Sequence, residues 1–189
     1  MRNKLDPIIH DNRLPLVIGH RGVAGYAPEN TIESIKKAYE LGVRWVELDV
    51  KLSRDGVPIL FHDDHLERTT NGCGKIANHN LLNLKHLDAG SWFKSEYKNV
   101  TIPTLQSALS ELKLYGIGAN LELKPSPGGE VKTGTIVGKL LRRAWPRELP
   151  PPIISSFSSL ALQAYAAEAP SVNNALLHLA VPRDWQLQL

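Results

Sequence analysis

Residues 44–62, RWVELDVKLSRDGVPILFH, hold two short apolar runs on either side of the turn SRDG. In the first run Glu47 and Asp49 are two residues apart, so their carboxylates leave the same face of a strand and the apolar residues leave the other. The later stretch GANLELK repeats this pattern with Glu122 and Lys124. Two strands of the same pattern predict a sheet with one apolar face and one face that gathers charge.

Strand-like and helical stretches alternate through the rest of the chain. The predicted strands span 14–20, 44–50, 57–62, 118–124, 151–157 and 173–180, and the predicted helices span 30–42, 104–116, 129–145 and 158–169. In PENT, Asn30 or Thr31 is expected to cap the first helix. Strands that alternate with helices favour parallel βαβ units, so the predicted fold class is α/β.

Residues 64–103 lack a sustained hydrophobic period and carry turn pairs such as NG. So long an irregular stretch inside a compact domain is usually functional or disordered. We therefore interpret 64–103 as an insertion or capping segment within a single domain that spans 1–189.

The composition excludes several classes of protein. The 22 basic and 19 acidic side chains leave a net charge of +3 without a basic stripe, so we expect no nucleic-acid partner. No uninterrupted apolar run reaches roughly 18 residues, so we expect no stable membrane insertion. A lone cysteine, Cys73, fits a reducing compartment, and we expect a cytoplasmic chain.

Three acids on two apolar strands form a candidate metal site. Glu47, Asp49 and Glu122 would repel one another and be costly to desolvate unless a cation or Lys124 compensates them. Oxygen ligands without a cysteine cluster favour a hard divalent ion, Mg²⁺ or Ca²⁺, over zinc. The alternative is that the acids belong to half-solvated strands, but the matching positions on two strands favour the ion.

Two histidines end predicted strands, and an arginine follows the first of them. A lone His20 or His62 would more often be structural, but both together, beside a candidate metal site, favour a general acid and base. The planar fork of Arg21 suits a phosphate. Its alternatives are a helix cap or a partner for a carboxylate.

The motifs HRGVAGYAPENT, ELDVKLSRDGVPILFHDDHLERTTNGCG and LELK resemble those of the glycerophosphodiester phosphodiesterase family, in the same order and across residues 15–125. The likeness is greatest to cytosolic bacterial enzymes of lipid and glycerol metabolism. The resemblance implies a TIM barrel of the kind found in phospholipase C-like phosphodiesterases. It also implies metal-dependent hydrolysis of glycerophosphodiesters, which are deacylated phospholipids, to sn-glycerol 3-phosphate and an alcohol.

The resemblance carries over to individual residues. It implies that the acid/base pair is His20 and His62, that the metal ligands are Glu47, Asp49 and Glu122, and that the phosphate contacts are Arg21 and Lys124. In the family a neighbouring glycerol hydroxyl attacks the phosphorus and water then opens the cyclic phosphate. The sequence does not distinguish this route from direct attack by water.

The chain of 189 residues is short for an eight-stranded barrel, which typically takes about 250. We therefore expect a C-terminally incomplete barrel, truncated after about five βα units. An open barrel exposes a strand edge, which a homo-oligomer could cover. Two other functions stay open: a related lipid phosphodiesterase of the lysophospholipase D or phospholipase C type, and an inactive truncated binding module.

Overall fold

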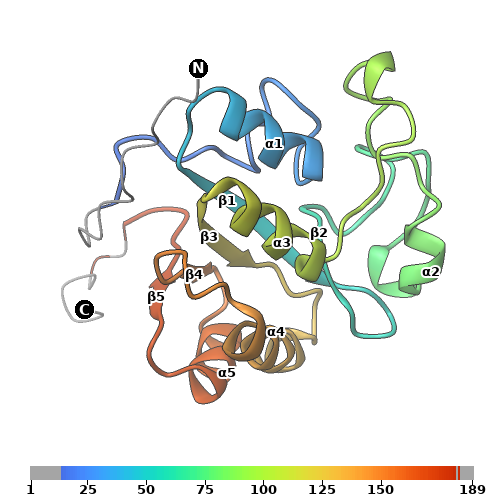
Figure 1. Cartoon of the computed structure of the whole chain (residues 1–189). Coiled ribbons are helices and arrows are strands. Elements are labelled where there is room, and N and C mark those ends of the chain that lie inside the picture. Colours follow the sequence, from blue (N-terminus) through green and yellow to red (C-terminus); the bar gives the residue numbers. More distant parts are fainter. Residues whose placement is uncertain (1–13, 182, 184–189) are drawn as a thin grey trace.

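Five strands form one sheet in the computed structural model, which describes residues 14–181 and 183 (Figure 1). The order across the sheet is β2-β1-β3-β4-β5, and all pairs are parallel except β1 with β2. The strands are β1 (Trp45–Leu52), β2 (Pro58–Leu60), β3 (Gly118–Leu123), β4 (Ile153–Ser156) and β5 (Asn173–Leu176). The parallel βαβ units predicted from the alternation are therefore present.

The helices lie close to the predicted ranges. They are α1 (Ile32–Glu40), α3 (Leu105–Tyr115), α4 (Glu130–Ala144) and α5 (Ser159–Glu168). Thr31 caps α1, because its hydroxyl oxygen accepts a hydrogen bond from the Ser34 amide at 3.1 Å. At the C-terminal end of α3, Gly116 takes a left-handed conformation that ends the helix. None of the helices in the described part of the chain is long and apolar enough to pass through a membrane.

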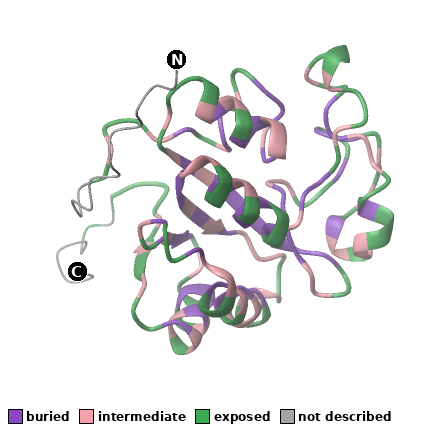
Figure 2. Cartoon of the chain, viewed as in Figure 1, coloured by how far each residue is buried: buried purple, intermediate pink, exposed green. Residues whose placement is uncertain are grey.

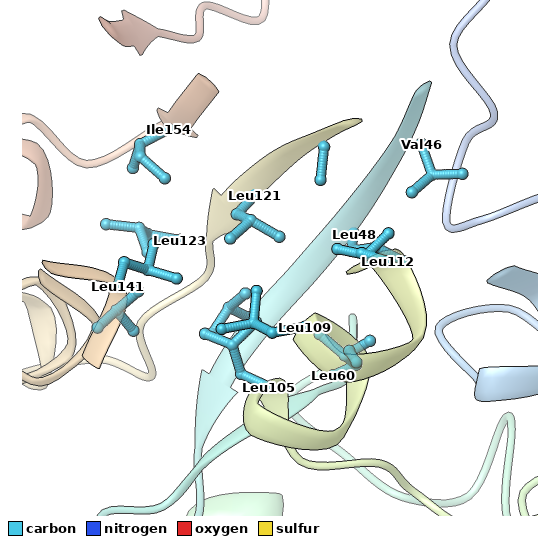
Figure 3. Packing of buried hydrophobic residues seen from close by; sticks show 14 of the residues in the cluster. Val46, Leu48, Leu60, Leu105, Leu109, Leu112, Leu121, Leu123, Leu141 and Ile154 are labelled. Carbon is cyan, nitrogen blue, oxygen red and sulfur yellow. The ribbon is translucent and has the colours of Figure 1, made fainter. Parts of the chain in front are cut away.

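One face of the sheet packs against these helices and forms the core. Leu48 of β1 and Leu121 of β3 are fully buried, and Figure 3 shows them facing the leucines of α3. Burying a leucine side chain stabilises a fold by roughly 1.5–3 kcal/mol. Figure 2 shows the result, since buried residues follow the strands and exposed residues follow the outer sides of the helices.

The strand predicted at 14–20 is wrong. Only Gly19 pairs with the sheet, through a single parallel bridge to Val46. Leu16 is fully exposed and Val17 is largely exposed, so these apolar side chains do not pack against the core. Strand propensity reflects packing on a half-buried surface, and a segment without that surface does not become a strand. The strands β2, β4 and β5 are also shorter than predicted, for they end where their pairing ends.

The segment 64–103 contains little regular structure but has its own small core. Its helical turns are η1 (Ile76–Asn78), α2 (Leu81–Leu84) and η2 (Ser95–Tyr97). Its buried apolar side chains pack against Ile59 of β2 and Phe61, which follows β2. The members from the segment itself are Leu66, Ile76, Leu84, Ala89 and Ile102. This cluster attaches the segment beside β2, at the edge of the sheet.

The contact between α4 and α5 depends on a small residue. A Cβ at Gly134 would lie 2.2 Å from the carbonyl oxygen of Ala161 and 2.9 Å from the Cβ of Ala164. We expect Gly134→Ala to lower the free energy of unfolding by about 1–3 kcal/mol, because overpacking outweighs the better helix propensity of alanine. Urea denaturation measures this change. Gly25→Ala, at an exposed glycine with no described atom within 4 Å, is the control and should change stability little.

Candidate active site

The predicted carboxylates meet on the face of the sheet opposite the helical core. β1 and β3 pair so that Asp49 lies beside Glu122, with Glu47 two residues earlier on the same face of β1. One oxygen from each of the three side chains lies within 4.8 Å of the others. The structure therefore brings together the three acids that the alternation singled out.

Glu47 is the least compensated of these acids. Its burial, followed by the charge of Asp49, raises its pKa to about 8, although the Arg21 amide donates a hydrogen bond to Oε2 at 2.9 Å. Its other oxygen, Oε1, is buried and has no hydrogen-bond partner among the described residues. An oxygen-only cluster with an orphaned carboxylate oxygen fits a hard divalent cation, which would supply the missing partner.

Asn30, in the loop before α1, forms two hydrogen bonds with Asp49. Its side-chain amide donates to Asp49 Oδ2 at 2.8 Å, and its Oδ1 accepts from the Asp49 amide at 3.0 Å. Asn30 has a φ of 56°, a conformation that asparagine adopts more readily than most residues. The sequence suggested it as a possible helix cap, but Thr31 has that role and Asn30 orients a candidate ligand instead.

The loop after Gly19 carries His20 and Arg21 to the acid cluster. The His20 side chain is 71% exposed, and its Nε2 lies 3.9 Å from Glu47 Oε2. Arg21 has a φ of 52°, and its Nε lies 3.4 Å from Asp49 Oδ2. The guanidinium also donates to Glu29 Oε1 at 2.8 Å. Arg21 therefore pairs with carboxylates, as the alternative reading of the sequence allowed, while it stays next to the cluster.

His62 and Lys124 line a cleft of about 600 Å³ together with Glu122. The Lys124 ammonium lies 2.7 Å from Glu122 Oε1 and 3.7 Å from Asp49 Oδ1. His62 Nδ1 lies 2.6 Å from Asp63 Oδ1. The other four predicted site residues are not part of the cleft lining but adjoin it through the carboxylate cluster.

Lys51 is a residue of this face that the sequence interpretation missed. It is two residues beyond Asp49, so the same alternation places it on the same face, and it lines the cleft. Its side chain is only 3% exposed and forms an ion pair with Asp64. The period that located Glu47 and Asp49 could have located Lys51 as well.

Parallel strands with polar residues at their carboxyl ends are the setting of active sites in α/β barrels. Residues 20–188 match the model of the glycerophosphoryl diester phosphodiesterase family. The chain belongs to this family, and the family predicted from the motifs is confirmed.

The relatives support the same conclusion. A glycerophosphodiester phosphodiesterase of Caldanaerobacter subterraneus is 35% identical over 179 residues, which are 92% of this chain and 71% of the relative. A phosphodiesterase of Oleispira antarctica, solved in complex with the product sn-glycerol-3-phosphate, is 47% identical with a TM-score of 0.90, over 93% of this chain and 71% of its own. The predicted TIM-barrel fold class is thereby confirmed. The chain spans 65% and 43% of the length of two Bacillus subtilis relatives that are 35% and 38% identical to it.

The raised pKa of Glu47 predicts a pH dependence of stability in the presence of a chelator. In the folded chain Glu47 keeps its proton up to about pH 8, whereas in the unfolded chain it loses the proton near 4.5. Between these values the folded state binds more protons, so its stability falls as pH rises. We expect wild type to lose stability relative to Glu47→Gln between pH 5 and pH 8.

Urea denaturation at several pH values, with chelator throughout, measures this difference. Glu96→Gln, at an exposed acid outside the cluster, is the control. A stability difference between wild type and Glu47→Gln that stays constant over this range would show that Glu47 ionises normally in the folded chain.

Proposed function

We propose that the chain acts as a metal-dependent glycerophosphodiester phosphodiesterase that releases sn-glycerol 3-phosphate and an alcohol. The observation that carries the proposal is the convergence of Glu47, Asp49 and Glu122, with one buried oxygen that has no hydrogen-bond partner in the part of the chain that the structure describes. The relative solved with sn-glycerol-3-phosphate supports the choice of product. The three carboxylates would hold Mg²⁺ or Ca²⁺, which would neutralise phosphate charge and polarise the phosphoryl group.

The cationic side chains would bind the phosphodiester. Arg21 and Lys124 lie on either side of Asp49, at 3.4 and 3.7 Å from its two oxygens. An anionic phosphodiester resists attack by a nucleophile until its charge is neutralised. The side chains of Arg21 and Lys124 both form ion pairs with carboxylates, so they are already oriented for a phosphate that binds over the carboxylate cluster.

The two histidines would move the protons. The hydrogen bond from Arg68, opposed by burial and aided by the bond to His62, lowers the pKa of Asp63 to about 2. Ionised Asp63 can only accept, so the contact with His62 requires a proton on Nδ1 and leaves Nε2 free to take or give a proton. His20 sits at the edge of the cluster with its ring exposed. We assign the pair as general acid and base, which suits both the cyclic-phosphate route and direct attack by water.

The cleft favours a deacylated substrate over an intact lipid. Its lining includes ionisable side chains from β1, β3, the loops after β2 and β3, and the first residue of α4, which are Lys51, His62, Asp63, Asp64, Glu122, Lys124 and Glu130. The same lining includes Leu123, Pro125, Pro127 and Phe157, but the ionisable side chains outnumber these apolar residues, whereas an acyl chain would require a mostly apolar channel. The lipid phosphodiesterase alternative is therefore less well supported than the glycerophosphodiester. We further propose that the segment 64–103 caps this site.

We also propose that the protein is cytoplasmic, with which the exposed free Cys73 is compatible.

We expect the purified chain to release glycerol 3-phosphate from glycerophosphocholine when Mg²⁺ or Ca²⁺ is added, and to lose this activity with chelator. His62→Ala should reduce the rate by about 10²–10⁴, the usual contribution of a positioned acid or base. An enzyme-coupled assay for glycerol 3-phosphate measures both effects. His86→Ala, at an exposed histidine of the segment 64–103, is the matched control and should retain activity.

Two outcomes would contradict the proposal. No turnover by a folded, metal-loaded chain would favour an inactive binding module. Release of product from lysophospholipids alone would favour the lipid phosphodiesterase.

We also propose that a homo-oligomer covers the open edge of the sheet at β5. Leu176 is exposed on the edge strand β5, and Leu14, Leu16 and Val17 are exposed in the segment before Gly19, which bridges to β1. We expect light scattering after size exclusion to give a mass above that of one chain, and Leu16→Glu to shift the species toward the monomer. A wild-type monomer at all concentrations would contradict this arrangement.

A further inference from the structure

Arg68, the fifth residue of the segment 64–103, is clamped between two carboxylates. Its Nη1 and Nη2 donate to the two oxygens of Glu29 at 2.9 and 2.7 Å. Its Nε and Nη2 donate to the two oxygens of Asp63 at 2.6 and 3.0 Å. Two bidentate pairs on one guanidinium fix its plane and its position, which a lysine ammonium could not do.

Each carboxylate in turn contacts a proposed site residue. Glu29 also accepts from Arg21 Nη1 at 2.8 Å, and Asp63 faces His62 Nδ1 at 2.6 Å. The contacts thus run from Arg21 through Glu29, Arg68 and Asp63 to His62 without a gap. One guanidinium connects the loop before α1 with the loop after β2.

In this series of contacts each carboxylate lies between two groups that donate hydrogen bonds to it. Burial tends to raise the pKa of Glu29, but the hydrogen bond from Arg68 and the charge of Arg21 together lower it. Both carboxylates are therefore ionised at neutral pH and can only accept hydrogen bonds. Asp63 consequently selects one neutral tautomer of His62, with the proton on Nδ1.

We propose that Arg68 is a positioning residue that holds Asp63 against His62 and Glu29 against Arg21. In this way it fixes the proton-transferring imidazole relative to the phosphate-binding guanidinium. The inference rests on the proposed function, because it concerns the same site. Arg68 acts through its neighbours, so its loss would loosen the alignment of both groups without removing either of them.

A purely structural role would change stability alone. The Arg68 side chain is 44% exposed, which screens its ion pairs, but Glu29 is only 9% exposed and both pairs are bidentate, so their loss should also cost some stability. Orientation of reacting groups has much larger effects on rates, since small misplacements cost large factors. The effect of Arg68 should therefore appear in catalysis and in the state of His62 more than in stability.

The test compares Arg68→Gln and Arg68→Lys with Arg54→Gln. Arg54 is a matched control because its Nε donates to Asn80 Oδ1 at 2.9 Å and so also ties the sheet side to the segment 64–103, without a contact to either histidine. Steady-state kinetics on glycerophosphocholine with added Mg²⁺ or Ca²⁺ give kcat and KM. Nitrogen-15 NMR of the imidazole rings reports the tautomer of His62 and needs no turnover.

We expect Arg68→Gln to lower kcat by about 10- to 100-fold, the usual effect of losing an outer partner that orients a reactive group. KM should change by less than about threefold, and Arg68→Lys should recover part of kcat because it keeps the charge but not the fork. In NMR, His62 should hold its proton on Nδ1 in wild type and in Arg54→Gln, and should show a mixture of tautomers in Arg68→Gln.

Two results would overturn the inference. An Arg68→Gln chain with the kcat and the His62 tautomer of Arg54→Gln would show that Arg68 positions nothing. A rise in KM with unchanged kcat and an unchanged tautomer would show that Arg68 affects substrate binding alone and does not position His62. If wild type does not turn over, the proposed function fails, and the NMR comparison alone decides whether Arg68 positions His62.

Discussion

The parallel pairing of β1 with β3, in the register that sets Asp49 beside Glu122, is the constraint on which the rest of the structure depends. Because side chains alternate along a strand, this register sends Leu48 and Leu121 to the helical core and the acids to the opposite face. A slip of one residue would exchange the two faces and place carboxylates among leucines. The same pairing therefore specifies the core and the candidate metal site together.

Gathering three acids on one face is unfavourable, and the loops around the sheet offset part of that cost. The Arg21 amide donates to Glu47, Asn30 donates to Asp49, and Lys124 donates to Glu122. Within residues 14–181 and 183 these partners leave Glu47 Oε1 without a hydrogen bond, as expected of a site arranged for a further ligand. Stability comes from the apolar face, and the polar face can remain strained for binding and catalysis.

The hydrophobic periodicity of the sequence predicted the features that depend on neighbouring residues alone. The alternation around Glu47 and Glu122 located the carboxylates, and the helical spacing at 104–116 located α3. The strand at 14–20 was mispredicted because its formation depends on pairing and burial. The link between Asn30 and Asp49, and that between Arg68 and Glu29, join segments 19 and 39 residues apart. No pattern within either segment indicates such contacts, so they required the three-dimensional structure.

The register of β1 and β3 is proposed to build a divalent cation site. The most direct measurement is an anomalous difference map from crystals of the chain soaked with Mn²⁺, an oxygen-seeking ion that can replace Mg²⁺. We expect one ion within about 2.0–2.6 Å of an oxygen from each of Glu47, Asp49 and Glu122. A map with no ion between these three side chains, while the carboxylates keep their positions, would contradict it.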